Sequence, residues 1–210
     1  MNVPPPDSRR FRQRRRDVLR AMGSGVMLIA TAPEVVRNRD THYPYRPDSY
    51  FHWLTGFAEP DAVLVLVAGK RPRQILFCRP SDVERELWEG RRWGPAAARA
   101  AFGFDAAWPI DRLDAHLPRL LANQSVLHHR IGADPAWDAR VTGWLKTVRS
   151  QARAGVRAPT SLVEAATLLD EMRLFKDADE IDRMRRAAAI SAAGHRRAMR
   201  ARPVTAPSPD

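Results

Sequence analysis

Histidine and carboxylate side chains are the residues of this sequence that could bind a divalent metal ion and activate water. The six histidines are spread along the chain, at positions 42, 52, 116, 128, 129 and 195. They form no His-Glu-x-x-His helix motif, and the carboxylates show no recognisable ligand spacing. His128 and His129 are adjacent in an expected strand, so they point to opposite faces and do not easily share a metal ion. We therefore interpret all six as surface or hydrogen-bonded histidines and assign no metal ligand.

Nucleophilic residues give no catalytic apparatus either. The sequence contains no Gly-x-Ser-x-Gly elbow, no phosphate-binding glycine loop and no dinucleotide-binding fingerprint. The single cysteine, Cys78, excludes an internal disulfide and lies in the apolar run 74–78. We interpret Cys78 as a small buried hydrophobic residue. Residue types alone thus predict no catalytic residue.

A different signal comes from Trp88-Glu-Gly-Arg-Arg-Trp93, in which two tryptophans flank a pair of arginines. Tryptophan and arginine are the residues most enriched in binding hot spots, and exposed indoles are costly in water. Two interpretations stay open: the segment forms an interface or a ligand-facing wall, or Trp88 and Trp93 pack onto their own domain.

The stretch Asp40–Pro60 holds all three tyrosines and two of the histidines. Proline restricts the residue before it, so we expect Tyr43 and Arg46 to be extended. Aromatic residues favour strands, so residues 50–54 predict a strand that ends at Gly56. Its aromatic side chains are interpreted as core.

The net charge of +11 is concentrated in two segments. Residues 1–20 carry an excess of five positive charges and residues 181–202 an excess of six, which leaves the rest of the chain neutral. Almost all the cations are arginine. Basic helices can bind a polyanion, but we place nucleic acid low among the partners.

The composition suits one domain of ordinary size with an appendage. No apolar run approaches the roughly 20 residues of a membrane span, and the arginine-rich N-terminus lacks the apolar stretch of a signal peptide. We therefore expect a cytoplasmic protein with no membrane partner.

The elements that must position these residues alternate between strands and helices. Short apolar runs predict strands at 26–30, 61–68, 73–79 and 125–131, of which the second and third form an antiparallel hairpin. Amphipathic spacing predicts helices at 8–22, 95–102, 110–122, 137–149 and 160–174, and a capping box at Asp177 and Glu180 starts another. Residues 81–87 read as a short helical or irregular piece and residues 150–159 as a linker. The fold class is α/β with a mixed β-sheet flanked by helices.

Three motifs resemble bacterial Xaa-Pro aminopeptidase (aminopeptidase P), a creatinase-type metallopeptidase. They are residues 37–64 (RNRDTHYPYRPDSYFHWLTGFAEPDAVL), 87–94 (LWEGRRWG) and 171–181 (EMRLFKDADEI). The match runs from about Arg9 to Met199 in the same order. It implies a hydrolase that removes the N-terminal residue preceding proline, with a mixed α/β N-terminal domain and a C-terminal "pita-bread" domain. In that family the second domain holds a dinuclear manganese site.

The resemblance stops at the first helix of the catalytic domain, so no metal ligand is carried over and no cofactor is expected in this chain. It implies a disordered leader (1–8), an aminopeptidase P N-terminal domain (9–157), a linker with the first helices of a truncated catalytic domain (158–202) and a disordered tail (203–210). We expect the apolar faces after residue 160 to be exposed, and the chain alone to be inactive although its family is metalloaminopeptidases. A fragment, a split gene and a truncated frame all remain open.

Two positions match family residues near the active site. Trp88 is similar to a tryptophan that reaches the neighbouring subunit's active site, and Asp40 to an aspartate close to that site; both imply a substrate-wall or orientation role. The resemblance thus predicts a homo-oligomer, a pita-bread domain acting in trans, and proline-containing peptides as partners only when that domain is present. The alternative is a stand-alone interaction module that uses the Trp88 loop and the basic helices.

Overall fold

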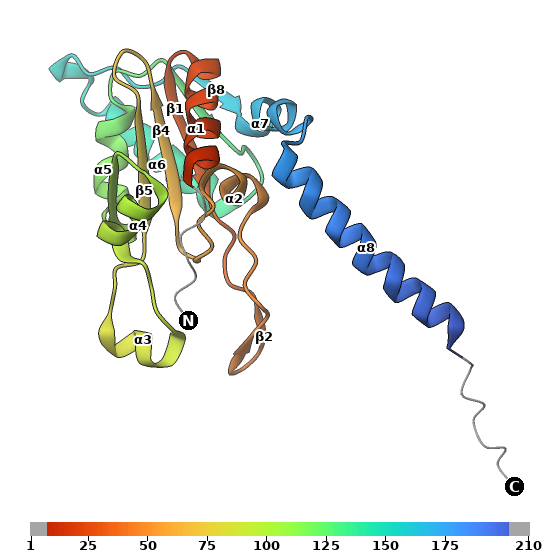
Figure 1. Cartoon of the computed structure of the whole chain (residues 1–210). Coiled ribbons are helices and arrows are strands. Elements are labelled where there is room, and N and C mark those ends of the chain that lie inside the picture. Colours follow the sequence, from red (N-terminus) through yellow and green to blue (C-terminus); the bar gives the residue numbers. More distant parts are fainter. Residues whose placement is uncertain (1–7, 202–210) are drawn as a thin grey trace, which may run out of the picture. The chain divides into compact units, whose positions relative to one another are not determined.

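The structure is a computed structural model of the chain that describes residues 8–201. It divides into two compact units, which meet between Leu169 and Asp170 (Figure 1). The leader expected at 1–8, apart from Ser8, and the tail expected at 203–210 lie outside the described residues. None of the described helices is both long and apolar enough to cross a membrane.

A six-stranded sheet forms the centre of the first unit, in the order β6-β5-β4-β1-β7-β8. Its strands are β1 Gly25–Ala30, β4 Val63–Ala68, β5 Arg73–Cys78, β6 Ala106–Pro109, β7 Val126–His129 and β8 Ser161–Glu164. β4 pairs antiparallel with β1 and β5, whereas the other three pairings are parallel. The predicted mixed α/β fold and the β4–β5 hairpin are therefore confirmed.

Helices cover both faces of this sheet (Figure 1). The α-helices are α1 Ser8–Met22, α2 Ser49–Thr55, α3 Val83–Glu89, α4 Gly94–Phe102, α5 Leu113–Leu121, α6 Pro135–Arg149, α7 Ala165–Arg173 and α8 Ala178–Arg200, and two 3-10 turns are η1 Ile110–Arg112 and η2 Ala152–Ala154. Side chains alternate between the faces of a strand. Val63 and Val65 of β4 pack in the core under α5 and α6, while Leu64 and Leu66 are buried on the face of α1, α2 and α4. The central strand is apolar throughout because both of its faces are covered.

The strand predicted at residues 50–54 is wrong, because these residues belong to helix α2. The Asp48 carboxylate accepts hydrogen bonds from the backbone N–H groups of Tyr50 and Phe51, which is an N-terminal helix cap. Gly56 ends the helix in the left-handed conformation. These two caps outweigh the weak preference of aromatic residues for strands.

The helix predicted from Thr160 also begins differently, since residues 161–164 form the edge strand β8. The segment 150–159 is not a free linker. Asn123 and Arg157 exchange two hydrogen bonds, and Val156 and Ala158 pack against the core. The domain boundary expected at residue 157 therefore falls inside the first unit.

The second unit, Asp170–Asp210, is described as far as residue 201. Its main element is α8, which begins with the predicted capping box: Asp177 and Glu180 each accept the other's backbone N–H. The helix has no buried residue. Its apolar side chains Met184 and Ile190 are exposed.

Candidate functional site

Five of the six strands have their carboxyl ends at the same edge of the sheet. β1 and β5 run in the same direction, and β6, β7 and β8 are parallel to them, so all five strands end at this edge. Two projections leave there (Figure 1). One is the hairpin of β2 Val36–Asn38 and β3 Thr41–His42, and the other is the segment that carries α3.

Helix α3 presents apolar side chains to solvent. Asp82 caps its N-terminus by accepting from the N–H groups of Glu84 and Arg85, and Gly90 ends it. Leu87 and Trp88 are 80% and 90% exposed. A capped helix that displays a tryptophan to water is suited to contact another surface.

The two tryptophans of this segment have different surroundings. Trp93 packs edge-on against Phe102, with ring centroids 5.2 Å apart, and the backbone N–H of Trp93 donates to Glu59 Oε1 at 2.8 Å. Burial raises the pKa of the Glu59 carboxyl, although this hydrogen bond and two nearby arginines oppose the shift. Trp93 thus anchors the base of the projection to its own domain, whereas Trp88 is exposed, so packing onto the same domain describes Trp93 and not Trp88.

Asp40 is exposed in the turn that joins β2 to β3. The hairpin around it is also exposed, including Val36 and Tyr43. The two sequence-predicted site residues, Asp40 and Trp88, therefore lie on separate projections that leave the same edge of the sheet (Figure 1).

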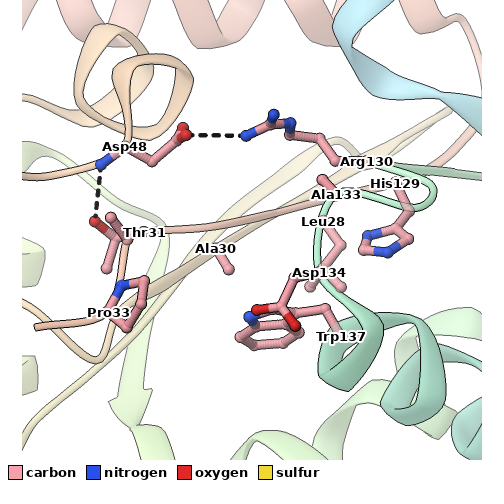
Figure 2. A pocket seen from close by; sticks show the side chains of 11 residues that line it. Leu28, Ala30, Thr31, Pro33, Asp48, His129, Arg130, Ala133, Asp134 and Trp137 are labelled. Carbon is pink, nitrogen blue, oxygen red and sulfur yellow. Dashed lines mark hydrogen bonds and ion pairs between the residues drawn. The ribbon is translucent and has the colours of Figure 1, made fainter. Parts of the chain in front are cut away.

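The same edge contains a pocket that the sequence did not predict. Its volume is about 240 Å³, and it opens between the carboxyl ends of β1 and β7. Figure 2 shows Asp48 joined to Arg130 on one side, at 3.0 Å, and Trp137 on the other. The chain continues from β1 to α2 on one face and from β7 to α6 on the other, and such switch points leave a crevice in open α/β sheets. The pocket depends on β1 and β7 being neighbours in the sheet, and the sequence does not show which strands are neighbours.

The histidines and the cysteine were expected to be structural. His129 is buried and hydrogen-bonded to Asp138 at 3.0 Å, while burial lowers the pKa of His128. Cys78 is confirmed as buried, and burial raises its pKa to about 12, so the thiolate is not formed near neutral pH. Across residues 8–201, no three His, Cys, Asp or Glu side chains gather closely enough to hold a metal ion. The described residues therefore do not fit a manganese centre.

The first unit is thus a mixed α/β domain with two exposed projections at one end of its sheet. Residues 11–128 match the family model of the aminopeptidase P N-terminal domain, more than half of the chain. The chain belongs to the aminopeptidase P family and comprises its N-terminal domain.

Relatives and solved structures agree with this assignment. The chain is 38% identical to an Xaa-Pro aminopeptidase of Escherichia coli over 90% of its own length but 44% of the relative's. It is similar to the structure of Pseudomonas aeruginosa aminopeptidase PepP, with a TM-score of 0.88, 39% identity and coverage of 94% of this chain and 45% of that one. A zinc-substituted Escherichia coli aminopeptidase P in complex with product gives a TM-score of 0.90, 37% identity and coverage of 95% and 46%. The chain thus spans less than half the length of these relatives.

Proposed function

We propose that this chain serves oligomerisation and active-site gating in an Xaa-Pro aminopeptidase, and that it performs no peptide-bond cleavage by itself. Catalysis would come from a manganese-dependent pita-bread domain, in the same longer protein or in a separate chain. Its substrates would be peptides with proline in the second position.

The observation that carries this proposal is the exposure of Trp88 on a helix with well-formed caps. Asp82 and Gly90 cap the helix, and the contact between Glu59 and Trp93 ties its base to the sheet, so the backbone that carries Trp88 is positioned. Backbone ordering before a partner binds lowers the entropic cost of association. Trp88 is our candidate for a wall residue that the chain contributes to a neighbouring active site.

Asp40 is the second candidate. Its hairpin leaves the same edge as α3, and its carboxylate is exposed in the turn. We propose that Asp40 orients a group at the shared surface. The alternative is a stand-alone interaction module that uses the Trp88 loop and the basic helices. Polyanion binding by α8 is the weaker part of this alternative, since Arg183 and Arg186 form ion pairs with Asp179 and Asp182.

The test of assembly is light scattering of the purified chain and of Trp88→Ala. We expect a self-associating chain and a weakening of association by about tenfold or more, since hot-spot tryptophans contribute about 2 kcal/mol or more. Trp108→Ala, at a 40% exposed position on edge strand β6, is the control and should associate normally. A chain that is monomeric at all concentrations would contradict the proposed role in oligomerisation.

The test of chemistry is peptidase activity on an Xaa-Pro peptide with manganese and a chelator control. We expect no activity from the chain alone. Chelator-sensitive activity would refute the non-catalytic assignment and would direct attention to the six histidines.

A further inference from the structure

A basic groove lies at the end of the sheet opposite the projections. It has a volume of about 540 Å³ and runs between the exposed side of α1 and the turn that joins β4 to β5. Arg12, Arg16 and Arg20 of α1 line one wall, and Gly69 and Pro72 of the turn line the other.

The arginines of α1 are evenly spaced along the groove. Positions four apart in a helix share a face, and each step advances by about 6 Å. Arg20 donates to Asp17 at 2.9 Å and is partly neutralised. Arg12 and Arg16 have no hydrogen bond or ion pair to any residue between 8 and 201. Both are exposed.

The opposite wall adds further positive charge. Lys70 and Arg71 lie in the turn between Gly69 and Pro72, and both are exposed. Asp105 is the one acidic residue that lines the groove, and its Oδ2 accepts the N–H of Gln74 at 2.7 Å. Two arginines without a carboxylate partner in the described chain thus line the groove with one carboxylate, and two further cations lie in the turn beside it.

The pKa of the buried residue Arg15 is affected by the positive charges of this groove. Arg15 is fully buried, and its guanidinium donates to Gln74 Oε1 and to the carbonyl oxygens of Leu54 and Phe102. The pKa of Arg15 is lowered to about 9, chiefly by burial, and the charges of Arg12 and Arg16 together lower it by more than Asp105 raises it.

The charge and the residue types of the groove indicate which kind of anion it would bind. The three arginines and one aspartate that line it sum to +2. When Lys70 and Arg71 of the adjacent turn and Asp17, the partner of Arg20, are counted as well, the sum is +3, which exceeds the charge of about −1.5 to −2 that one phosphate group carries near neutral pH. No aromatic side chain lines it, so nucleic-acid bases would have no stacking platform. Arginine forks bind phosphate oxygens in pairs. We propose that this groove is a binding site for a chain of two or three linked phosphates, either inorganic or at the end of a nucleotide.

The experiment is isothermal titration calorimetry of the 210-residue chain at low ionic strength. The probes are tripolyphosphate, ATP, orthophosphate and a single-stranded oligonucleotide. We expect saturable binding of tripolyphosphate, at least tenfold tighter than orthophosphate. Equal affinities for tripolyphosphate and ATP would support an inorganic ligand, and tighter ATP binding would support a nucleotide.

The decisive variant is Arg12→Glu with Arg16→Glu, which should weaken tripolyphosphate binding by at least tenfold. Arg149→Glu with Arg153→Glu makes the same charge change at exposed positions of α6 and η2 and should bind like the parent chain. If the first variant fails to fold, Arg12→Gln with Arg16→Gln tests the same contacts with a smaller change.

Three results would overturn the proposal. Orthophosphate could bind as tightly as tripolyphosphate, the oligonucleotide could bind more tightly than either polyphosphate, or both charge-reversal variants could lose affinity equally. The last result would mean that only the overall charge attracts the anion.

Discussion

Helices α2 and α3 are matched in almost every local respect. Each has seven residues, an aspartate whose carboxylate caps the N-terminus and a glycine at the C-terminal cap. Yet α2 buries Phe51 and Leu54 completely, whereas none of residues 83–88 of α3 is buried and Trp88 is 90% exposed.

The difference shows that local sequence is enough to form a short helix, whereas tertiary packing determines whether its side chains are buried or exposed. α2 contributes its aromatic residues to the core beneath α1, where Phe51 meets Phe57 edge-on at 6.4 Å. α3 stands outside the core and leaves Leu87 and Trp88 exposed. The same caps therefore support stability in one helix and, in our proposal, association in the other.

The largest contrast should come from core truncation. Phe51→Ala removes a fully buried ring from α2 and should lower the free energy of unfolding by about 3–5 kcal/mol. Leu87→Ala in α3 should change it by less than about 0.5 kcal/mol, because the side chain is exposed. Denaturant unfolding followed by circular dichroism measures both. Equal losses would mean that α3 packs onto the domain in solution.

The C-terminal caps give the next contrast. A Cβ at Gly56 would lie 2.5 Å from the Phe11 ring, and its φ of 67° is strained for other residues. Gly56→Ala should lower the free energy of unfolding by about 2–4 kcal/mol, because the strain of the left-handed conformation and the overpacking against Phe11 add up. At Gly90 a Cβ would meet nothing within 4 Å, but its φ of 86° and ψ of 167° lie in a region used almost only by glycine. Gly90→Ala should therefore lower the free energy of unfolding by the backbone strain alone, about 1–3 kcal/mol. A Gly90→Ala variant less stable than Gly56→Ala would contradict this order.

The N-terminal caps differ in the length and exposure of the ion pair that each aspartate makes. Asp48→Ala loses the cap and leaves Arg130 without its partner at 3.0 Å, so we expect a loss of about 1–2 kcal/mol. Asp82→Ala should cost about 0.5–1 kcal/mol, since Arg85 is farther from it, at 3.6 Å, and well exposed. Asp48→Asn separates the two terms, because it keeps an acceptor for the cap and removes the charge. Thermal unfolding at matched pH would show the order.

The smallest effect concerns Glu59, which follows α2 and holds the backbone of Trp93 after α3. Its pKa is raised in the folded state, chiefly by burial, so the folded chain binds more protons than the unfolded chain just above the ordinary value of 4.5. The stability of the parent chain should therefore fall relative to Glu59→Gln as the pH rises through this window. Urea midpoints of the two chains across the pH series test it, and a difference that grows in the opposite direction would show that Arg79 and Arg92 dominate.

Much of the fold could be predicted from residue patterns. The runs that became β1, β4, β5 and β7 were readable because they are apolar and bounded by turn residues. β6 and β8 were not predicted, since AAWP and SLVE are too short and mixed to show a period. For α2 the sequence holds two conflicting signals. Asp48 and Gly56 are typical helix caps, whereas the aromatic residues between them favour a strand.

The sequence by itself determined the family, the mixed α/β class and the two candidate residues, because long motifs and apolar periodicity are local properties. Only the tertiary structure decided that Trp93 packs inward while Trp88 faces solvent. It also decided that five strands end at one edge, and that the arginines of α1 face the β4–β5 turn. These facts depend on strand order and on contacts between residues far apart in the chain. Local patterns do not record such contacts, since a side chain's surroundings are set by which elements pack against it.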